Sequence, residues 1–257
     1  MPSSPTKTLQ VEKANVAIYP TRKAMGEAAA IQAAKIIQAA IAARGQARIV
    51  IATGNSQLDF IDALVVQKAI DWTKVEAFHM DEYVGIAPNH PASFRHWIKT
   101  RVQNRVPVSK LHYIEGDVKD VNDEVVRYSR LLNAAPVDLA FVGFGENGHI
   151  AFNDPPVADF NDPATLKVVT LEDACRRQQV GEGHFKDIAS VPEQAITVTC
   201  PGLFRAAAWV CCVPERRKAE AVRNALKNPI STACPATIVR THPQAFVYLD
   251  LESASLL

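Results

Sequence analysis

The sequence lacks the cysteine patterns that indicate disulfide bonds or a structural zinc site. Its five cysteines are odd in number, form no Cys-x-x-Cys pair and have no His-rich neighbourhood. Cys211 and Cys212 stand together in the apolar run AAAWVCCV, where cysteine behaves as a small buried hydrophobe. Since disulfide bonds belong mainly to oxidising compartments, these cysteines predict a protein of the cytoplasm.

Long apolar runs and an excess of charge of one sign are also missing. No segment approaches the length of a membrane-spanning helix, and the N-terminal stretch MPSSPTKTLQVEK has no apolar core of a signal peptide. The net charge of +1 favours neither nucleic acid nor an anionic lipid surface. We therefore expect no nucleic-acid partner and no membrane partner. A small phosphorylated ligand is still compatible with this net charge, because a few local cations suffice to bind one phosphate.

Helical and strand patterns alternate along the 257 residues. Near-continuous apolar runs are typical of parallel strands buried on both faces, and strands that alternate with helices favour right-handed βαβ crossovers. We predict an α/β fold with a doubly wound, mostly parallel sheet, built as one domain over residues 1–257 with a poorly ordered tail at 1–14. Strands are predicted at 47–54, 75–80, 110–114, 137–145, 164–171, 194–200, 206–213 and 245–250, and helices at 21–44, 56–66, 91–102, 121–133, 172–180 and 215–228.

Three loops that follow predicted strands carry polar side chains, and open parallel sheets bind ligands at this edge. The first loop comprises Thr53, Gly54, Asn55 and Ser56. Gly54 permits a tight turn, the other three offer short polar groups, and the N–H groups of the next helix point to the same place, which suits an anion. Similar turns cap helices in α/β proteins that bind nothing there. The pattern alone therefore leaves an anion site and a simple cap both open.

The second loop places two adjacent carboxylates, Asp81 and Glu82, after the strand predicted at 75–80. Neighbouring side chains at a strand end point in different directions, so the two carboxylates need not act as a pair. Taken alone, this segment is more simply interpreted as a loop cap that faces water.

The third loop is rich in glycine and contains a histidine. The segment GFGENGHIAFNDP surrounds His149 with glycines, which allow close backbone approach and unusual backbone dihedrals. Histidine transfers protons near neutral pH without a large pKa shift. Asn147 and Asp154 stand near enough in the sequence to orient the imidazole ring. A lone loop histidine is most often structural, but this combination favours a catalytic role.

The segments FHMDEYVGI, HPASFR and GFGENGHIAFNDP resemble the glucosamine-6-phosphate deaminase/isomerase family in order and spacing, and the similarity in pattern runs from about residue 15 to 250. Relatives of the 6-phosphogluconolactonase branch share a Gly-x-Gly-x-x-Gly-His core but usually continue with Thr and small residues. The resemblance implies a modified Rossmann-like fold. It also implies the conversion of glucosamine 6-phosphate to fructose 6-phosphate and ammonia, without a metal or other cofactor.

The resemblance also implies roles for four residues. Asp81 would be the base that takes the proton from C2 of the open-chain sugar and returns it to C1. His149 would assist ring opening by moving a proton between the ring oxygen and the anomeric hydroxyl. Asn147 and Asp154 would hold His149 in its working tautomer. Two of these positions depart from the usual family pattern, since Asn147 stands where many members carry Asp and Asp154 replaces a Glu.

The substrate-binding residues carried over by the resemblance come from the same loops and from two later segments. Glycine-rich loops can stabilise the developing enolamine through backbone N–H groups. Lys218, in the predicted helix after the strand at 206–213, would bind the phosphate, and Arg176 is assigned from the segment where the family has a phosphate-binding arginine. The full set is Thr53, Gly54, Asn55, Ser56, Glu82, Gly145, Gly148, Arg176 and Lys218.

Other functions remain open at this stage. A lactonase would use His149 to activate water and would have less need of Asp81. A deaminase could act instead on galactosamine 6-phosphate, since epimer choice depends on one or two hydroxyl contacts. A non-catalytic sugar-phosphate sensor normally carries a fused DNA-binding module, for which this chain has no spare residues. The expected partner is a small sugar phosphate, and the sequence leaves a homo-oligomer open.

Overall fold

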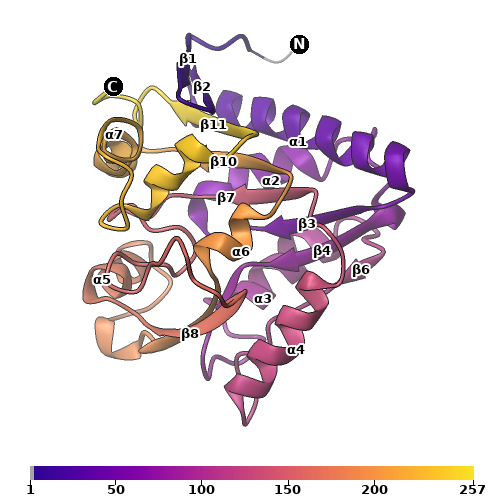
Figure 1. Cartoon of the computed structure of the whole chain (residues 1–257), viewed down its shortest axis with the longest axis vertical. Coiled ribbons are helices and arrows are strands. Elements are labelled where there is room, and N and C mark those ends of the chain that lie inside the picture. The colour runs from indigo at the N-terminus through magenta and orange to yellow at the C-terminus, as the bar shows by residue number, and fades with distance from the viewer. Residues whose placement is uncertain (1–2) are drawn as a thin grey trace.

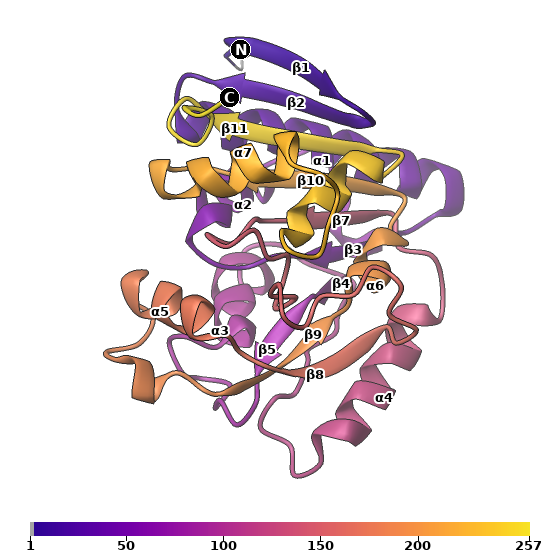
Figure 2. The same cartoon turned by 60° about the vertical axis from the view of Figure 1, so that its left-hand side comes forward.

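The computed structural model describes residues 3–257. Within them, a large sheet has the strand order β1-β2-β11-β10-β7-β3-β4-β6, and a small sheet has the order β5-β9-β8 (Figures 1 and 2). All neighbours in the large sheet run parallel except β1 and β2. The predicted α/β fold with a mostly parallel sheet is confirmed. The large sheet comprises β1 (Lys7–Val11), β2 (Ala14–Tyr19), β3 (Ala47–Ile51), β4 (Val75–His79), β6 (Lys110–Leu111), β7 (Leu139–Val142), β10 (Ala208–Val213) and β11 (Ala245–Asp250).

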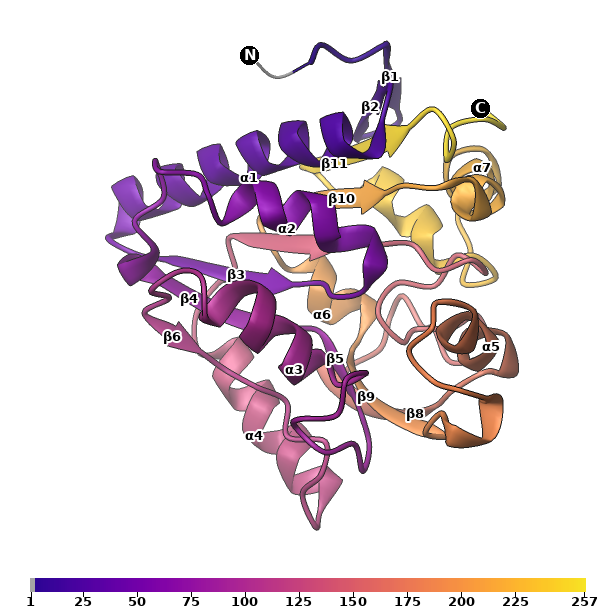
Figure 3. The ribbon, with the colours of Figure 1, turned by 180° about the vertical axis from the view of Figure 1, so that it is seen from behind.

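Helices cover both faces of the large sheet. Figure 2 shows α6 and α7 in front of the sheet, and Figure 3, seen from behind, shows α1, α2 and α3 on the other side. The helices are α1 (Arg22–Arg44), α2 (Leu58–Leu64), α3 (Phe94–Ile98), α4 (Val121–Asn133), α5 (Asp173–Gly181), α6 (Cys200–Phe204) and α7 (Ala219–Lys227). Shorter helical turns lie at Asn55–Gln57, Trp72–Lys74, Lys99–Gln103, Ile188–Ser190, Arg216–Lys218 and Pro235–Thr241.

The ends of α1 follow from local sequence signals. The Thr21 hydroxyl accepts a hydrogen bond from the backbone N–H of Ala24, as an N-cap residue does, and Gly45 ends the helix with a φ of 77°. Small side chains then let α1 pack closely against its neighbours. A Cβ on Gly26 would lie 2.8 Å from backbone atoms of Asp59 and Phe60, so this glycine sets the distance between α1 and α2.

The small sheet differs from the sequence prediction, which placed 164–171 and 194–200 among the alternating strands of one sheet. Here β8 (Leu166–Thr170) and β9 (Gln194–Val198) pair antiparallel, and β9 also pairs with β5 (Asp81–Tyr83). These strands bury a second apolar cluster that includes Tyr83, Phe94 and Phe152. The chain after β4 therefore forms a strand of its own where the sequence indicated a loop.

The predicted tail at 1–14 is wrong for the residues that form β1 and begin β2. Lys7–Val11 pair with Ala14–Ile18 in an antiparallel hairpin at the edge of the large sheet. The segment KTLQV is mostly exposed, so its apolar content gave little signal, and the pairing partner β2 decides its structure. Residues 1–2 lie outside the described part of the chain.

No helix in the described part of the chain combines the length and the apolar character needed to cross a membrane.

Candidate active site

One pocket opens at the carboxyl ends of the central strands and gathers residues from all three predicted loops. It lies where β3, β4 and β7 end, as expected for an open parallel sheet. It is closed on another side by α5 and by the turn after β10. Among the predicted site residues, the following line it: Thr53, Gly54, Asn55, Ser56, Asp81, Gly145, His149 and Lys218.

The loop after β3 is a rigid cradle. Gly54 has a φ of 90°, a left-handed conformation that favours glycine. The Gln57 side chain donates to the Ser56 hydroxyl at 3.1 Å and to the Cys212 carbonyl of β10 at 3.2 Å. The guanidinium of Arg22 contacts the Asn55 carbonyl oxygen, so α1 also holds the loop. The polar groups of this cradle are therefore positioned before any ligand arrives.

Asp81 begins β5, and its carboxylate borders the pocket. The residue is only 7% exposed, and its Oδ1 atom has no hydrogen-bond partner. Burial, together with the nearby charge of Glu82, holds the pKa of Asp81 well above its ordinary value. A buried carboxylate with an unpaired oxygen and a raised pKa is suited to accept a proton from a ligand in the pocket.

Glu82 is not a pocket residue, which corrects the predicted substrate-binding role. Its carboxylate accepts hydrogen bonds from the backbone N–H groups of Tyr83, Phe94 and Arg95 at 3.0, 3.1 and 2.9 Å. The Ser93 hydroxyl donates a fourth bond at 2.7 Å. Adjacent residues of a strand point to opposite faces. Glu82 therefore turns away from Asp81 and binds the N-terminal end of α3.

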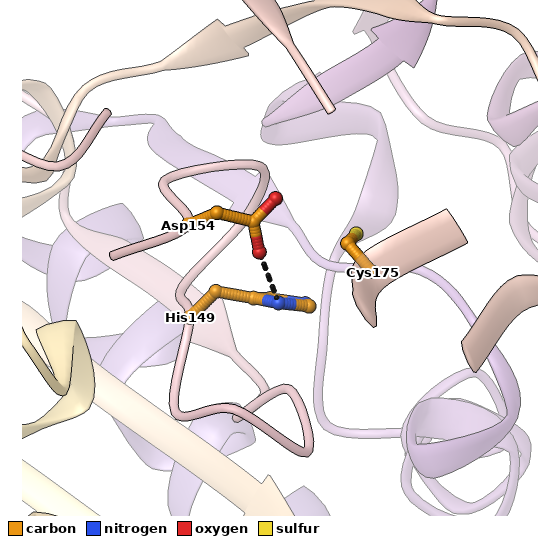
Figure 4. A group of neighbouring side chains, drawn as sticks. All are labelled: His149, Asp154 and Cys175. Atoms are coloured by element: carbon orange, nitrogen blue, oxygen red, sulfur yellow. Dashed lines mark ion pairs between the residues drawn. The ribbon is translucent and has the colours of Figure 1, made fainter. Parts of the chain in front are cut away.

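His149 lines the pocket with Asp81, and it pairs with Asp154, which is buried and does not line the pocket. The Nδ1 atom of His149 lies 2.9 Å from Oδ1 of Asp154, a close ion-pair contact that is not aligned as a hydrogen bond (Figure 4). Burial alone would raise the pKa of Asp154, but contacts with His149 and Asn147 outweigh it and lower this pKa. Asp154 is therefore held ionised against the imidazole.

Asn147 supports this pair indirectly. Its Nδ2 atom donates to Asp154 at 2.9 Å and to Glu172 at 3.1 Å, and its Oδ1 atom accepts the backbone N–H of His149 at 3.0 Å. It makes no hydrogen bond to the imidazole ring in the structure. The expectation that Asn147 itself holds the working tautomer of His149 is therefore corrected: Asn147 positions the Asp154 carboxylate and the loop backbone.

The His149 ring packs against Gly145, in space that a Cβ atom would occupy. A Cβ built on Gly145 would lie 2.2–2.3 Å from the Cε1, Nδ1 and Nε2 atoms of that ring. We expect Gly145→Ala to displace the imidazole and reduce kcat at least ~100-fold, because misplacement by about 1 Å costs that much in a positioned site. Steady-state kinetics and the melting temperature check this. Gly181→Ala is the matched control, since its Cβ would meet nothing within 4 Å. Wild-type kcat in Gly145→Ala would contradict the assignment.

Gly148 serves the fold instead of lining the pocket, which corrects another predicted substrate-binding residue. Its φ is 83°, and a Cβ there would lie 2.4 Å from the sulfur of Cys234. Its carbonyl oxygen accepts the backbone N–H of Ala236 at 2.8 Å. Gly148 therefore joins the histidine loop to the turn at Pro235–Thr241.

Arg176 also lies outside the pocket, so its predicted phosphate-binding role is wrong. Its guanidinium donates to the carbonyl oxygens of Ile188 and Val191 at 2.8 and 3.1 Å. It thereby holds the turn that follows α5. Positions spaced by three, four and seven residues share a helix face. Cys175, Gln178, Gln179 and Glu182 share the inward face, and Arg176 lies beside it.

That inward face supplies pocket residues that the sequence analysis missed, namely Gln178, Gln179 and Glu182. The helical spacing from Cys175 was the signal available for them. The other missed lining residues are Ala52, Met80, Phe94, Gly143, Phe144, Ala151 and Phe152. All except Ala52 stand within the segments that carry the family resemblance, but small and apolar side chains give no local signal that they face a ligand.

Lys218 places a buried cation in the pocket wall. The residue is 3% exposed, and its Nζ atom lies 4.0 Å from Oε1 of Glu182. Burial lowers the pKa of Lys218, and the charge of Glu182 opposes that shift. Burial would raise the pKa of Glu182, but His184, Lys218 and Arg217 together lower it to about 2. The pocket thus has Lys218 paired with Glu182 at one end, and Asp81 and His149, which can transfer protons, at the other.

The comparisons with known proteins agree with this geometry. The family model described as glucosamine-6-phosphate isomerases/6-phosphogluconolactonase matches residues 20–248. A glucosamine-6-phosphate deaminase of Exiguobacterium sp. strain AT1b is 35% identical over 206 residues, which cover 80% of this chain and 78% of the relative. A glucosamine-6-phosphate deaminase of Bacillus cereus strain AH820 is 31% identical over 242 residues, which cover 94% of this chain and 88% of the relative.

Two solved structures share the fold of this chain. A monomeric glucosamine-6-phosphate deaminase, described as a missing link of the NagB superfamily, superposes with a TM-score of 0.87 at 27% identity, covering 94% of this chain and 99% of that one. A 6-phosphogluconolactonase from Shewanella baltica OS155 superposes with a TM-score of 0.76 at 18% identity, covering 94% of this chain and 99% of that one. The second likeness shows a shared fold alone.

Proposed function

Because the chain belongs to the glucosamine-6-phosphate isomerase/6-phosphogluconolactonase family, we propose that it is a glucosamine-6-phosphate deaminase. It would convert glucosamine 6-phosphate and water to fructose 6-phosphate and ammonia. One observation carries the proposal: a single pocket is lined by a buried carboxylate with a free oxygen, by a histidine that pairs with a buried aspartate, and by a buried lysine. A cytoplasmic location accords with the five buried free cysteines.

In the first step, His149 opens the sugar ring. The imidazole transfers a proton between the anomeric hydroxyl and the ring oxygen, so that C1 becomes an aldehyde carbon. Asp154, at 2.9 Å from Nδ1, fixes the ring orientation. Asn147 holds Asp154 in place.

In the second step, Asp81 moves a proton from C2 to C1. The carboxylate takes the C2 proton while the C1 carbonyl oxygen gains a proton, which gives an enolamine. Asp81 then returns its proton to C1 as the amino nitrogen loses one, so the product is a C2 imine, and the proton lost by nitrogen balances the one gained by the C1 oxygen. Water then adds to C2, and ammonia leaves. The raised pKa of Asp81 suits this shuttle, because a base whose pKa lies nearer the working pH both accepts and returns a proton readily.

The 53–56 loop and Lys218 bind the phosphate at the other end of the pocket. The incoming phosphate would replace Glu182 as the partner of Lys218, while Glu182 keeps its contacts with His184 and Arg217. Holding the sugar by its phosphate positions C1 and C2 against Asp81 and His149.

Lys218→Met tests the phosphate site. We expect KM for the sugar phosphate to rise about 10- to 100-fold, because a hydrogen bond to a charged group is worth about 1.5–3 kcal/mol. Initial-rate kinetics over a range of substrate concentrations measure this. Arg216→Met removes an exposed cation from the same turn and should leave KM unchanged. Equal KM values in both variants would place the phosphate elsewhere.

The proposed activity is tested by mixing the purified protein with glucosamine 6-phosphate and following ammonia and fructose 6-phosphate together. Equal amounts of both products are expected. Galactosamine 6-phosphate and 6-phosphogluconolactone are assayed in parallel. Turnover of one of these instead would reassign the substrate, and an absence of all three reactions would favour a sugar-phosphate sensor.

A further inference from the structure

Cys175 lies beside the His149–Asp154 pair and has no part in the proposed reaction. Figure 4 shows the three side chains facing one another, with Cys175 coming from α5 and the other two from the loop after β7. One ring nitrogen, one carboxylate oxygen and the thiol sulfur all lie within 4.8 Å of each other, and all three residues are buried. No role implied by the family resemblance uses this cysteine.

The donor set matches a soft divalent cation. Zinc takes sulfur, imidazole nitrogen and carboxylate oxygen at about 2.0–2.3 Å, which puts tetrahedral ligand atoms about 3.3–3.8 Å apart. The present spacing therefore needs an inward shift of about an ångström, within reach of a side-chain rotation at Cys175.

A second observation is that one of these buried donor atoms has no hydrogen-bond partner. Asp154 is 1% exposed, and its Oδ2 atom has no hydrogen-bond partner. The other oxygen of Asp154 already lies 2.9 Å from Nδ1 of His149, so Oδ2 is the atom left without a partner. A buried polar atom without a partner is costly, so a cation that binds Oδ2 would gain from its position.

We propose that Cys175, His149 and Asp154 form a reversible inhibitory site for a thiophilic divalent cation, with Zn²⁺ as its type. The bound metal takes a ring nitrogen of His149 and an oxygen of Asp154, so the pair can no longer open the sugar ring. The thiol proton passes to solvent when the thiolate binds. This site is distinct from a catalytic cofactor, because its occupancy stops the reaction.

Cys175 itself should be dispensable for turnover. Burial, with the neighbouring Asp154 carboxylate, raises the pKa of the Cys175 thiol well above its ordinary value, so the thiol is neutral in the metal-free protein. The inhibitory effect rests on the proposed function, whereas metal binding does not.

The test compares the wild type with Cys175→Ser and with Cys200→Ser, a control at another buried cysteine. Micromolar Zn²⁺ is expected to inhibit the wild type and Cys200→Ser, with recovery on adding a chelator. Cys175→Ser should keep its turnover and need at least ~10-fold more Zn²⁺ for the same inhibition. Equal sensitivity of all three proteins would overturn the proposal.

Cobalt provides a readout that needs no substrate. Co²⁺ bound through Cys175 should show thiolate-to-cobalt charge-transfer absorption in the near ultraviolet, absent in Cys175→Ser and present in Cys200→Ser. If the wild type shows this absorption band but has no deaminase activity, the metal site is supported and the proposed function is not. Absence of the band in the wild type would overturn the site, whatever the activity.

Discussion

Asp81→Asn is expected to lower kcat by ~10²–10⁴-fold or more while leaving the protein folded and somewhat more stable. The loss follows because the amide cannot take a proton from C2, and general base catalysis contributes about that factor. The gain in stability follows from burial. Asp81 is 7% exposed and its Oδ1 atom has no partner, so ionising it inside the protein is unfavourable.

The effect on stability has a defined dependence on pH. The pKa of Asp81 is raised in the folded protein, so the neutral acid is the form that folding favours. Its contribution to stability is fully present below the unfolded pKa and is lost as the pH rises through the folded pKa. Asparagine carries no charge at any of these pH values. The variant should therefore melt above the wild type at neutral pH, and the difference should vanish in acid.

Thermal melts across a pH series and single-turnover assays of the same preparations measure both effects. A variant that is inactive and melts at a lower temperature at neutral pH would indicate a structural Asp81 instead of a base. Full activity in Asp81→Asn would remove Asp81 from the mechanism, whatever its stability.

Glu82→Gln, one residue further along, is expected to lose stability and to keep its turnover, the reverse of Asp81→Asn. Burial raises the pKa of Glu82, so the expected loss comes from its hydrogen-bond donors and not from its charge. We expect the free energy of unfolding to fall by about 1–3 kcal/mol, the cost of leaving a buried donor without a partner. Three backbone N–H groups and the Ser93 hydroxyl donate to this carboxylate. The amide NH₂ of glutamine would face some of these donors and leave them unpaired.

Arg95 should increase the loss of stability in Glu82→Gln. Its Nε atom lies 3.4 Å from Glu82, while its other nitrogens bind Asp117 at 2.7 Å and the Ile86 carbonyl at 2.7 Å. Replacement of the Glu82 carboxyl group leaves a largely buried guanidinium with less compensation.

Urea denaturation monitored by circular dichroism measures the loss in Glu82→Gln. Asp117→Asn, which removes the half-exposed partner of Arg95, is the matched control and should cost less than about 1 kcal/mol. The folded fraction of Glu82→Gln should keep most of its turnover, since Glu82 does not line the pocket. A stable but inactive Glu82→Gln would restore the substrate-binding role.

Much of the architecture could be predicted because its signals are local. The helix predicted at 21–44 is found at Arg22–Arg44, with Thr21 capping one end and Gly45 the other. The buried strands at Ala47–Ile51 and Ala208–Val213 lie within the strands predicted at 47–54 and 206–213. The glycine-rich loop could be recognised from consecutive residues, and its histidine lies in the pocket.

The corrections concern long-range contacts. Arg176 was assigned from its place in the sequence, yet the carbonyl oxygens of Ile188 and Val191 bind its guanidinium outside the pocket. Gly148 owes its importance to Cys234, which lies far along the chain. A local motif does not reveal such partners, because they meet only when the chain is folded.

The adjacent pair Asp81 and Glu82 shows most clearly what the sequence determines and what the tertiary structure decides. The sequence by itself determined that two carboxylates follow a buried strand, and that their side chains would point in different directions. The tertiary structure decided which of them faces the ligand. The pairing of β5 with β9 orients the strand, so Asp81 borders the pocket and Glu82 binds α3. A shift of one residue in that pairing would exchange the two roles, because side chains alternate between the faces of a strand.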